Sequence, residues 1–177
     1  MLLLTATGAV RGADETWAMA SDGAAGFDFL LGSWKVHNQK LRDVADRDCT
    51  EWIEFDARSE VVPILLGGGN FDRMTVENPP DGPAFEGDTL RIFDPATDEW
   101  SIWWSSTRSP GKLDVPVRGR FDGTAGVFEC DDVVGGLRVV TRFDWTAGDH
   151  PRWQQSFSYE AGVFDPPNWI MTFERTQ

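Results

Sequence analysis

The stretch FEGDTLRIFDPATDEWSIWWSS, residues 85–106, predicts a β-hairpin. Its two halves, Phe85–Phe93 and Glu99–Ser106, are rich in the aromatic, β-branched and Ser/Thr residues that favour extended strands. Between them, Asp94–Asp98 holds Pro95, whose fixed φ suits the first central position of a type I turn. This hairpin is the repeating unit of the predicted fold.

The same pattern repeats on both sides of the hairpin, with Gly, Pro, Asn and Asp crowded into the gaps. The segment Val61–Leu66 carries Pro63, so we expect it to merge with a neighbouring segment across a bulge, which leaves about ten strands. The other predicted strands are Ser33–Leu41, Thr50–Ser59, Phe71–Glu77, Pro116–Phe121, Gly126–Cys130, Leu137–Trp145, Trp153–Tyr159 and Trp169–Arg175.

Consecutive hairpins indicate an all-β fold. No long helical period follows Gly26, and strands do not alternate with helices. An open sheet of about ten strands would leave long exposed edges, and closure removes them. We therefore predict a closed antiparallel up-and-down barrel over residues 26–177, with a sandwich of two sheets as the alternative. Residues 1–25 are expected to form a leader, mobile or with a short helix near Asp14–Ala20, that contributes little to the fold.

Length and charge narrow the class of protein. The 177 residues fit one domain, and 29 acidic against 16 basic residues give a net charge of −13. This charge argues against nucleic acid or an anionic membrane as a partner, and no apolar run is long enough to cross a bilayer. Met1–Leu4 lacks a basic flank, so we expect a cytoplasmic protein, with a truncated secretion signal as the alternative. A homodimer is compatible with these features.

The two ends of the predicted barrel carry a family resemblance. Gly32-Ser-Trp34 begins the first predicted strand, and Arg175 ends the last. This arrangement resembles the calycin superfamily of lipocalins, fatty-acid-binding proteins and nitrobindin-like barrels, and among them small uncharacterised bacterial members. The resemblance implies that Trp34 plugs one barrel end and that Arg175 lies across it in a cation–π contact, which makes Gly32, Trp34 and Arg175 structural residues.

Haem and metal ions are considered because some nitrobindin-like barrels bind haem through a histidine. The chain has only His37 and His150, and neither has a Cys or His neighbour at the spacing of a metal site. We therefore expect no haem, no metal and no other cofactor. Cys49 and Cys130 lie outside any nucleophile motif and are expected to be small buried groups.

The high tryptophan content is the strongest indication of a ligand pocket in the sequence: the chain has nine Trp and twelve Phe but one Tyr. Aromatic walls with a few polar groups are typical of pockets for apolar ligands. We predict that Trp103, Trp153, Trp169 and Gln155 line such a pocket. The alternative is that these side chains simply fill the barrel.

Arginines on the predicted strands supply candidate polar anchors. If Arg118, Arg120 or Arg142 points inward, it needs a carboxylate partner, which a ligand could provide, because a buried unpaired charge is costly. The alternative is that these residues point outward and form cross-strand pairs such as Arg120 with Glu129.

Three functions follow from this architecture. The first is binding of a small, largely apolar or carboxylate-bearing molecule inside the barrel. The second is an enzyme, of the isomerase, cyclase or decarboxylase type, that uses an inward carboxylate with a raised pKa. Its candidate acids are Glu129 and Asp131, with Glu51 and Glu86 as further choices. The third is a filled barrel with a structural role.

Overall fold

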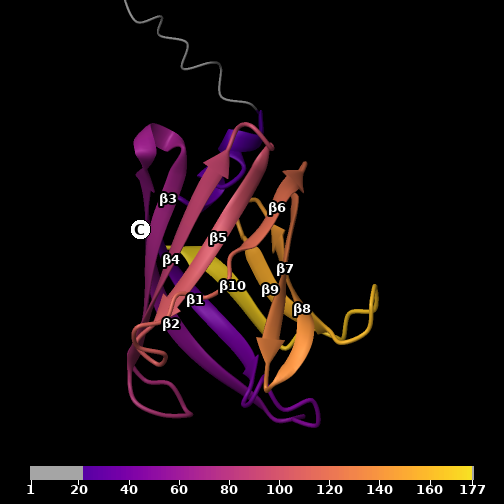
Figure 1. The fold of residues 1–177 in the computed structure, drawn as a ribbon. Helices are drawn as coiled ribbons and strands as arrows, with labels where there is room; N and C mark the ends of the chain where they lie inside the picture. Colours follow the sequence, from indigo (N-terminus) through magenta and orange to yellow (C-terminus); the bar gives the residue numbers. More distant parts are fainter. Residues whose placement is uncertain (1–21, 177) are drawn as a thin grey trace, which may run out of the picture.

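The computed structural model describes residues 22–176, and its ten strands close into one antiparallel barrel (Figure 1). Around the barrel the strands follow the order β1-β10-β9-β8-β7-β6-β5-β4-β3-β2. Their bounds are β1 Gly32–Leu41, β2 Trp52–Ile64, β3 Gly69–Val76, β4 Phe85–Asp94, β5 Glu99–Ser106, β6 Val117–Asp122, β7 Ala125–Val134, β8 Leu137–Thr146, β9 Arg152–Ser158 and β10 Trp169–Arg175.

Closure comes from the pairing of the first strand with the last. β1 and β10 are antiparallel neighbours, with Trp34 opposite Arg175 and Lys40 opposite Trp169. Every other neighbouring pair is consecutive in sequence, so the barrel is an up-and-down meander. The predicted all-β closed barrel of about ten strands is confirmed, and the alternative of two packed sheets is excluded because the ladder has no free edge.

Two details of the strand prediction differ from the structure. β2 runs from Trp52 to Ile64 as one strand and pairs with β1 and β3 in unbroken register, so the expected bulge near Pro63 is absent. β7 continues to Val134, well beyond the predicted end at Cys130, because the whole strand pairs with β8. Cross-strand pairing thus extends β7 through a run of acidic residues that have low strand propensity.

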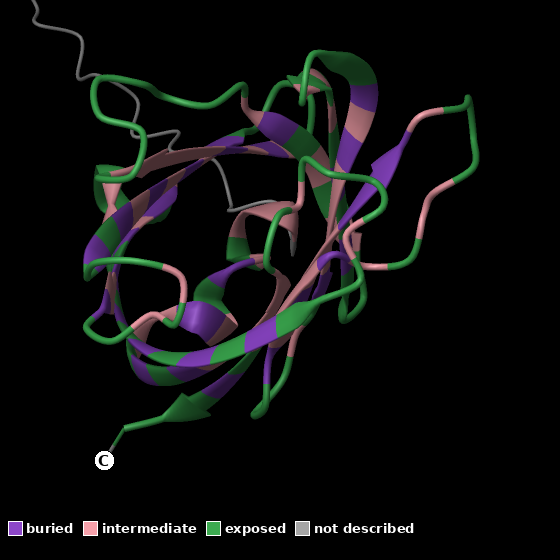
Figure 2. Ribbon diagram, turned by 90° about the horizontal axis from the view of Figure 1, so that it is seen from below, coloured by how far each residue is buried: buried purple, intermediate pink, exposed green. Residues whose placement is uncertain are grey.

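Burial alternates along the strands, as a barrel requires. In β2, Ile53, Phe55, Ala57, Ser59 and Val61 are buried, and the residues between them are exposed. Successive side chains of a strand point to opposite faces, so the buried set lines the interior. Figure 2 shows the same banding of buried and exposed residues on the strands around the ring.

Two short 3-10 helices precede β1 at one end of the barrel: η1 Asp22–Ala25 and η2 Asp28–Leu30 (Figure 1). Most of the predicted leader, including the expected helix at residues 14–20, lies outside the described residues. Its last four residues, however, form η1, where Ala24 packs against the core and the Gly23 carbonyl accepts a hydrogen bond from Trp100 Nε1 at 2.8 Å. No helix among residues 22–176 is long and apolar enough to cross a membrane.

Candidate functional site

An aromatic plug fills the barrel end at which η1 and η2 lie. Phe27, which is fully buried, contacts the rings of Trp100, Phe121, Phe128 and Trp145 at centroid distances of 5.1, 4.9, 5.5 and 5.7 Å. Three of these four contacts are edge-to-face, the arrangement that aromatic rings prefer. This end of the barrel is therefore solid.

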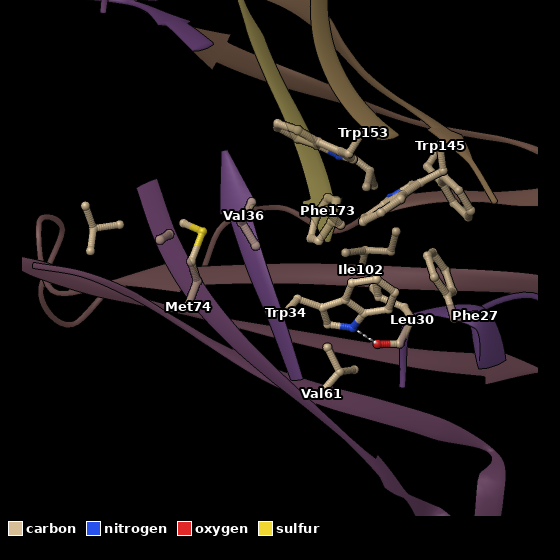
Figure 3. Packing of buried hydrophobic residues seen from close by; sticks show 14 of the residues in the cluster. Phe27, Leu30, Trp34, Val36, Val61, Met74, Ile102, Trp145, Trp153 and Phe173 are labelled. Carbon is tan, nitrogen blue, oxygen red and sulfur yellow. Dashed lines mark hydrogen bonds between the residues drawn. The ribbon is translucent and has the colours of Figure 1, made fainter. Parts of the chain in front are cut away.

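Trp34 completes the plug (Figure 3). Its Nε1 donates a hydrogen bond to the carbonyl of Leu30 at 2.6 Å. The Arg175 guanidinium lies 4.3 Å from the centroid of the Trp34 ring. Arg175 also donates to the carbonyls of Leu31 at 2.9 Å and Phe29 at 3.0 Å. The φ of +113° at Gly32 is a conformation that favours glycine and turns the chain from η2 into β1. The group joins the first and last strands and has a structural role.

The other half of the barrel contains a cavity of about 270 Å³. Strands β4 to β10 line it, and the inward positions of β5, β8, β9 and β10 carry large rings. The aromatic residues that line it are Trp104, Phe143, Trp145, Trp153, Phe157 and Trp169. Phe143 and Trp169 each contact the Trp153 ring edge-to-face, at 4.9 and 5.6 Å. The rings thus brace one another and leave an apolar space between them.

Two backbone and side-chain features hold the indoles in place. Gly87 of β4 leaves room for Trp104, since a Cβ at that position would lie only 1.9 Å from Cη2 of the indole. Trp169 Nε1 donates to Asn38 Oδ1 at 2.9 Å, which orients the second indole from the neighbouring strand β1. These contacts make the cavity wall a preformed surface.

A buried ion pair lies at the inner end of the cavity, next to the plug. Arg91 of β4 is 4% exposed and lines the cavity. Its Nη1 is 2.8 Å from Asp72 Oδ2 and 2.9 Å from Asn70 Oδ1, both on β3. Its guanidinium also lies 5.2 Å from the ring centroid of Phe27 and 5.7 Å from that of Trp145.

Two buried donors in the barrel lack an acceptor among the described residues: Arg91 Nε and Asn38 Nδ2. Gln155, also on the cavity wall, is satisfied, because its Nε2 donates to Asn168 Oδ1 at 2.9 Å. Buried polar groups are normally hydrogen-bonded, so these two donors, which are themselves closed off from the cavity, each carry a cost in folding free energy.

Acidic groups lie at the outer end of the cavity. Asp114, in the connection between β5 and β6, and Asp132 of β7 both line it. Although Asp114 as a residue is exposed, partial burial of its carboxyl raises its pKa, and the nearby Asp132 charge adds to this. Burial raises the pKa of the Cys130 thiol to about 11, helped by Asp132, Asp131 and Asp114. Cys130 is therefore a neutral thiol at pH 7 and a poor nucleophile.

The structure brings three of the predicted ligand-binding residues together. Trp153, Trp169 and Gln155 line the cavity. Trp103 does not, because it alternates with the buried Ile102 and lies half-buried on the outer face of β5. The inward indole of that strand is Trp104. The composition of the two faces of this strand could have shown which one points inward. Trp103 shares its face with Ser101 and Ser105, whereas Trp104 shares its face with Trp100 and Ile102.

The predicted arginine anchors lie on the outside of the barrel. Arg118 is exposed on β6, opposite Glu129 of β7. Arg120 Nη2 lies 3.2 Å from Glu99 Oε1. Arg142 lies 2.8 Å from Asp144 and 3.8 Å from Glu129. Each alternates with an inward residue of its strand, so none reaches the cavity. Arg91, which was not among the predicted anchors, points inward and lines the cavity.

The predicted acids and histidines are also outside the cavity. Glu129, Asp131, Glu51 and Glu86 are exposed, and Glu51 pairs with Arg42 at 2.8 Å. His37 Nδ1 lies 3.0 Å from Asp56 Oδ1 on the outer face, and His150 is exposed in the turn between β8 and β9. Within residues 22–176 no three His, Cys, Asp or Glu side chains are grouped in a way that could hold a metal ion.

Comparison with known proteins gives a fold relationship only. No protein-family model matches the chain, and no curated protein sequence matches it. By structure it is similar to the crystal structure of Rv2717c from M. tuberculosis, with a TM-score of 0.52 and 13% identity over 87% of this chain and 98% of that chain. This likeness supports the barrel and is silent on activity.

Proposed function

We propose that the chain is a calycin-like barrel that binds a small, largely apolar molecule inside the cavity of about 270 Å³. The observation that carries the proposal is the contrast between the two halves of the barrel: one is packed solid with aromatic rings, and the other leaves an apolar space walled by rings. Ligand pockets are mostly apolar with a few placed polar groups, and they are largely preformed.

The size of the cavity limits the ligand. At the roughly 30 Å³ that a water molecule occupies in the liquid, the space equals several waters, and it lies just below the range of about 300–1,000 Å³ found for drug-sized ligands. A compound of one or two rings, or a short branched chain, matches this space. A purely structural barrel would gain stability from filling it, because each void costs packing contacts.

Binding is tested with a panel of small aromatic and branched apolar compounds, followed by the melting temperature and by tryptophan emission. A ligand that binds only the folded protein raises the melting temperature through linkage. Trp153→Leu, which removes a ring from the cavity wall, is expected to abolish the shift in melting temperature. Trp103→Leu, on the outer face, is the matched control and is expected to preserve it. No shift with any compound would favour the structural role instead.

An enzyme acting in the same cavity is the second candidate, and the raised pKa of Asp114 favours it. A carboxyl whose pKa is raised on the wall of an apolar cavity is a candidate general acid. With any compound that binds, hydrogen–deuterium exchange or product formation is followed by NMR. If Asp114→Asn loses turnover but still binds the compound, catalysis is supported. If the compound is unchanged after prolonged incubation with the protein, binding without catalysis is supported.

A further inference from the structure

The charge state of the ligand can be inferred from the two ends of the cavity. At the inner end, the positive charge of Arg91 is already matched by Asp72 at 2.8 Å, with the two side chains only 5% and 8% exposed. Asn70 accepts a further hydrogen bond from the same nitrogen of Arg91. The other terminal nitrogen of Arg91, Nη2, donates to no atom of the described residues and is not among the fully buried atoms, so Arg91 offers the cavity a hydrogen-bond donor but no net charge.

We propose, resting on the proposed binding function, that the ligand is a neutral molecule whose carbonyl, ether or hydroxyl oxygen accepts a hydrogen bond from Arg91 Nη2 at the inner end. Its apolar body then lies among Trp104, Phe143 and Trp153. This assignment replaces the expectation of a carboxylate held by an inward arginine.

The buried ion pair argues against an anionic head group. A ligand carboxylate beside Arg91 would place a second negative charge next to Asp72 in a region of low dielectric constant. Two carboxylates that share one site cannot both ionise without a large shift of one pKa. A single arginine cannot neutralise both the Asp72 carboxylate and a ligand carboxylate. The free-energy cost of desolvating the ligand carboxylate would therefore remain largely uncompensated.

The charges at the outer end of the cavity also disfavour an anionic ligand. Asp114 and Asp132 line the cavity there, and neither forms an ion pair within 4.0 Å in residues 22–176. Their negative field, on a chain with a net charge of −13, opposes the approach of an anion. A neutral molecule does not meet this barrier.

The unused donor explains why an acceptor on the ligand would matter. No atom of the described residues accepts from Arg91 Nη2, although the residue as a whole is buried. A site built around a polar group discriminates strongly against analogues that leave that group unpaired. An apolar ligand without an oxygen would therefore bind more weakly than one of the same shape that carries it.

The test uses three compounds of nearly equal shape: 2-acetylnaphthalene, 2-ethylnaphthalene and 2-naphthoate. We expect the ketone to bind at least about tenfold more tightly than the hydrocarbon and the carboxylate, measured by calorimetry and by the shift in melting temperature at pH 7.5. A carboxylate that binds as tightly as the ketone would overturn the inference. A hydrocarbon that binds as tightly as the ketone would also overturn the inference, although the proposed binding function would stand. Failure of all three would overturn the inference and count against the proposed function as well.

A substitution at the ion pair sharpens the test. Asp72→Asn removes the negative charge that compensates Arg91 and keeps the side-chain shape. We expect the variant to bind 2-naphthoate at least about tenfold more tightly than the unchanged protein does, whereas its affinity for the ketone changes little. Asp88→Asn is the matched control, because Asp88 pairs with Arg73 at 3.1 Å on the outer face. An unchanged affinity for naphthoate in a folded Asp72→Asn protein would contradict the proposal. If that variant does not fold, the ranking of the three compounds with the unchanged protein decides.

Discussion

Trp34 shows how much a single side chain does in this barrel. The indole is 1% exposed, contacts Phe173 of β10 edge-to-face at 6.1 Å, and uses its only donor on Leu30. The Arg175 guanidinium covers it from the last strand. Removal of the ring would therefore loosen η2, β1 and β10 at the position where the barrel closes.

Trp34→Ala is expected to lower the free energy of unfolding by about 3–5 kcal/mol, because it truncates a large buried ring and leaves a cavity. Urea unfolding followed by far-UV circular dichroism measures this loss. Trp103→Ala is the matched control, since Trp103 is half-buried on the outer face of β5 and is expected to cost clearly less. Equal losses in the two variants would mean that Trp34 does not hold the closed end together.

Arg91 illustrates a different use of a buried side chain. A barrel that only needed a packed core would gain as much from an apolar residue at this position, because the desolvation of an ion pair can exceed its attraction. The position of Arg91 on the cavity wall, with Asp72 and Asn70 beside it, places a hydrogen-bond donor there.

The segment η1 is a small element with a defined contact. Gly23 accepts from Trp100 Nε1, and Gly26 lies so close to Phe121 that an added Cβ would be 2.8 Å from its ring. The chain before β1 thus packs against the aromatic plug from Gly23 onward. These contacts at Gly23 and Ala24 are where the expectation that residues 1–25 contribute little to the fold can be tested.

Two truncated chains test the contribution of η1. A chain that starts at residue 26 is expected to melt several degrees below one that starts at residue 22. The shorter chain leaves the Trp100 donor without its acceptor, which costs about 1–3 kcal/mol, and each kcal/mol shifts the melting temperature by about 2–4 °C at this size. Differential scanning calorimetry of both chains gives the difference. Identical melting temperatures would show that η1 does not stabilise the plug.

The molecule as a whole carries far more negative than positive charge. Several exposed ion pairs lie on its surface, such as Arg42 with Glu51 at 2.8 Å and Arg73 with Asp88 at 3.1 Å. Pairs of this kind contribute little each, whereas the excess of acidic residues repels itself over the whole surface. The repulsion should therefore dominate the response of the protein to salt.

Raising NaCl from about 10 mM to 1 M is expected to raise the melting temperature by several degrees, because the screening length falls from about 30 Å to about 3 Å. Thermal denaturation by circular dichroism at pH 7.5 measures the effect. KCl serves as the control, since general screening does not distinguish the two cations. A melting temperature that falls with salt would mean that the surface ion pairs outweigh the net repulsion.

Local features of the sequence determine the strands and their order. The period-2 pattern of segments such as Glu99–Ser106 and the turn at Asp94–Asp98 depend only on neighbouring residues, so both can be predicted without knowledge of the rest of the chain. The barrel follows as well, because about ten antiparallel strands have one simple way to avoid exposed edges. The extension of β7 to Val134 could not be predicted, since it depends on pairing with β8.

The candidate site, in contrast, was decided by the tertiary structure. Alternation divides a strand into two faces but does not say which one points inward, and a one-residue error moves the whole set of side chains to the other side. Trp104 rather than Trp103, and Arg91 rather than Arg118, Arg120 or Arg142, reach the cavity because pairing with neighbouring strands orients their faces. Asp114 lies in a connection with no period at all, and only the closed barrel brings it beside Asp132. The cavity is a property of contacts between distant segments, which no local pattern records.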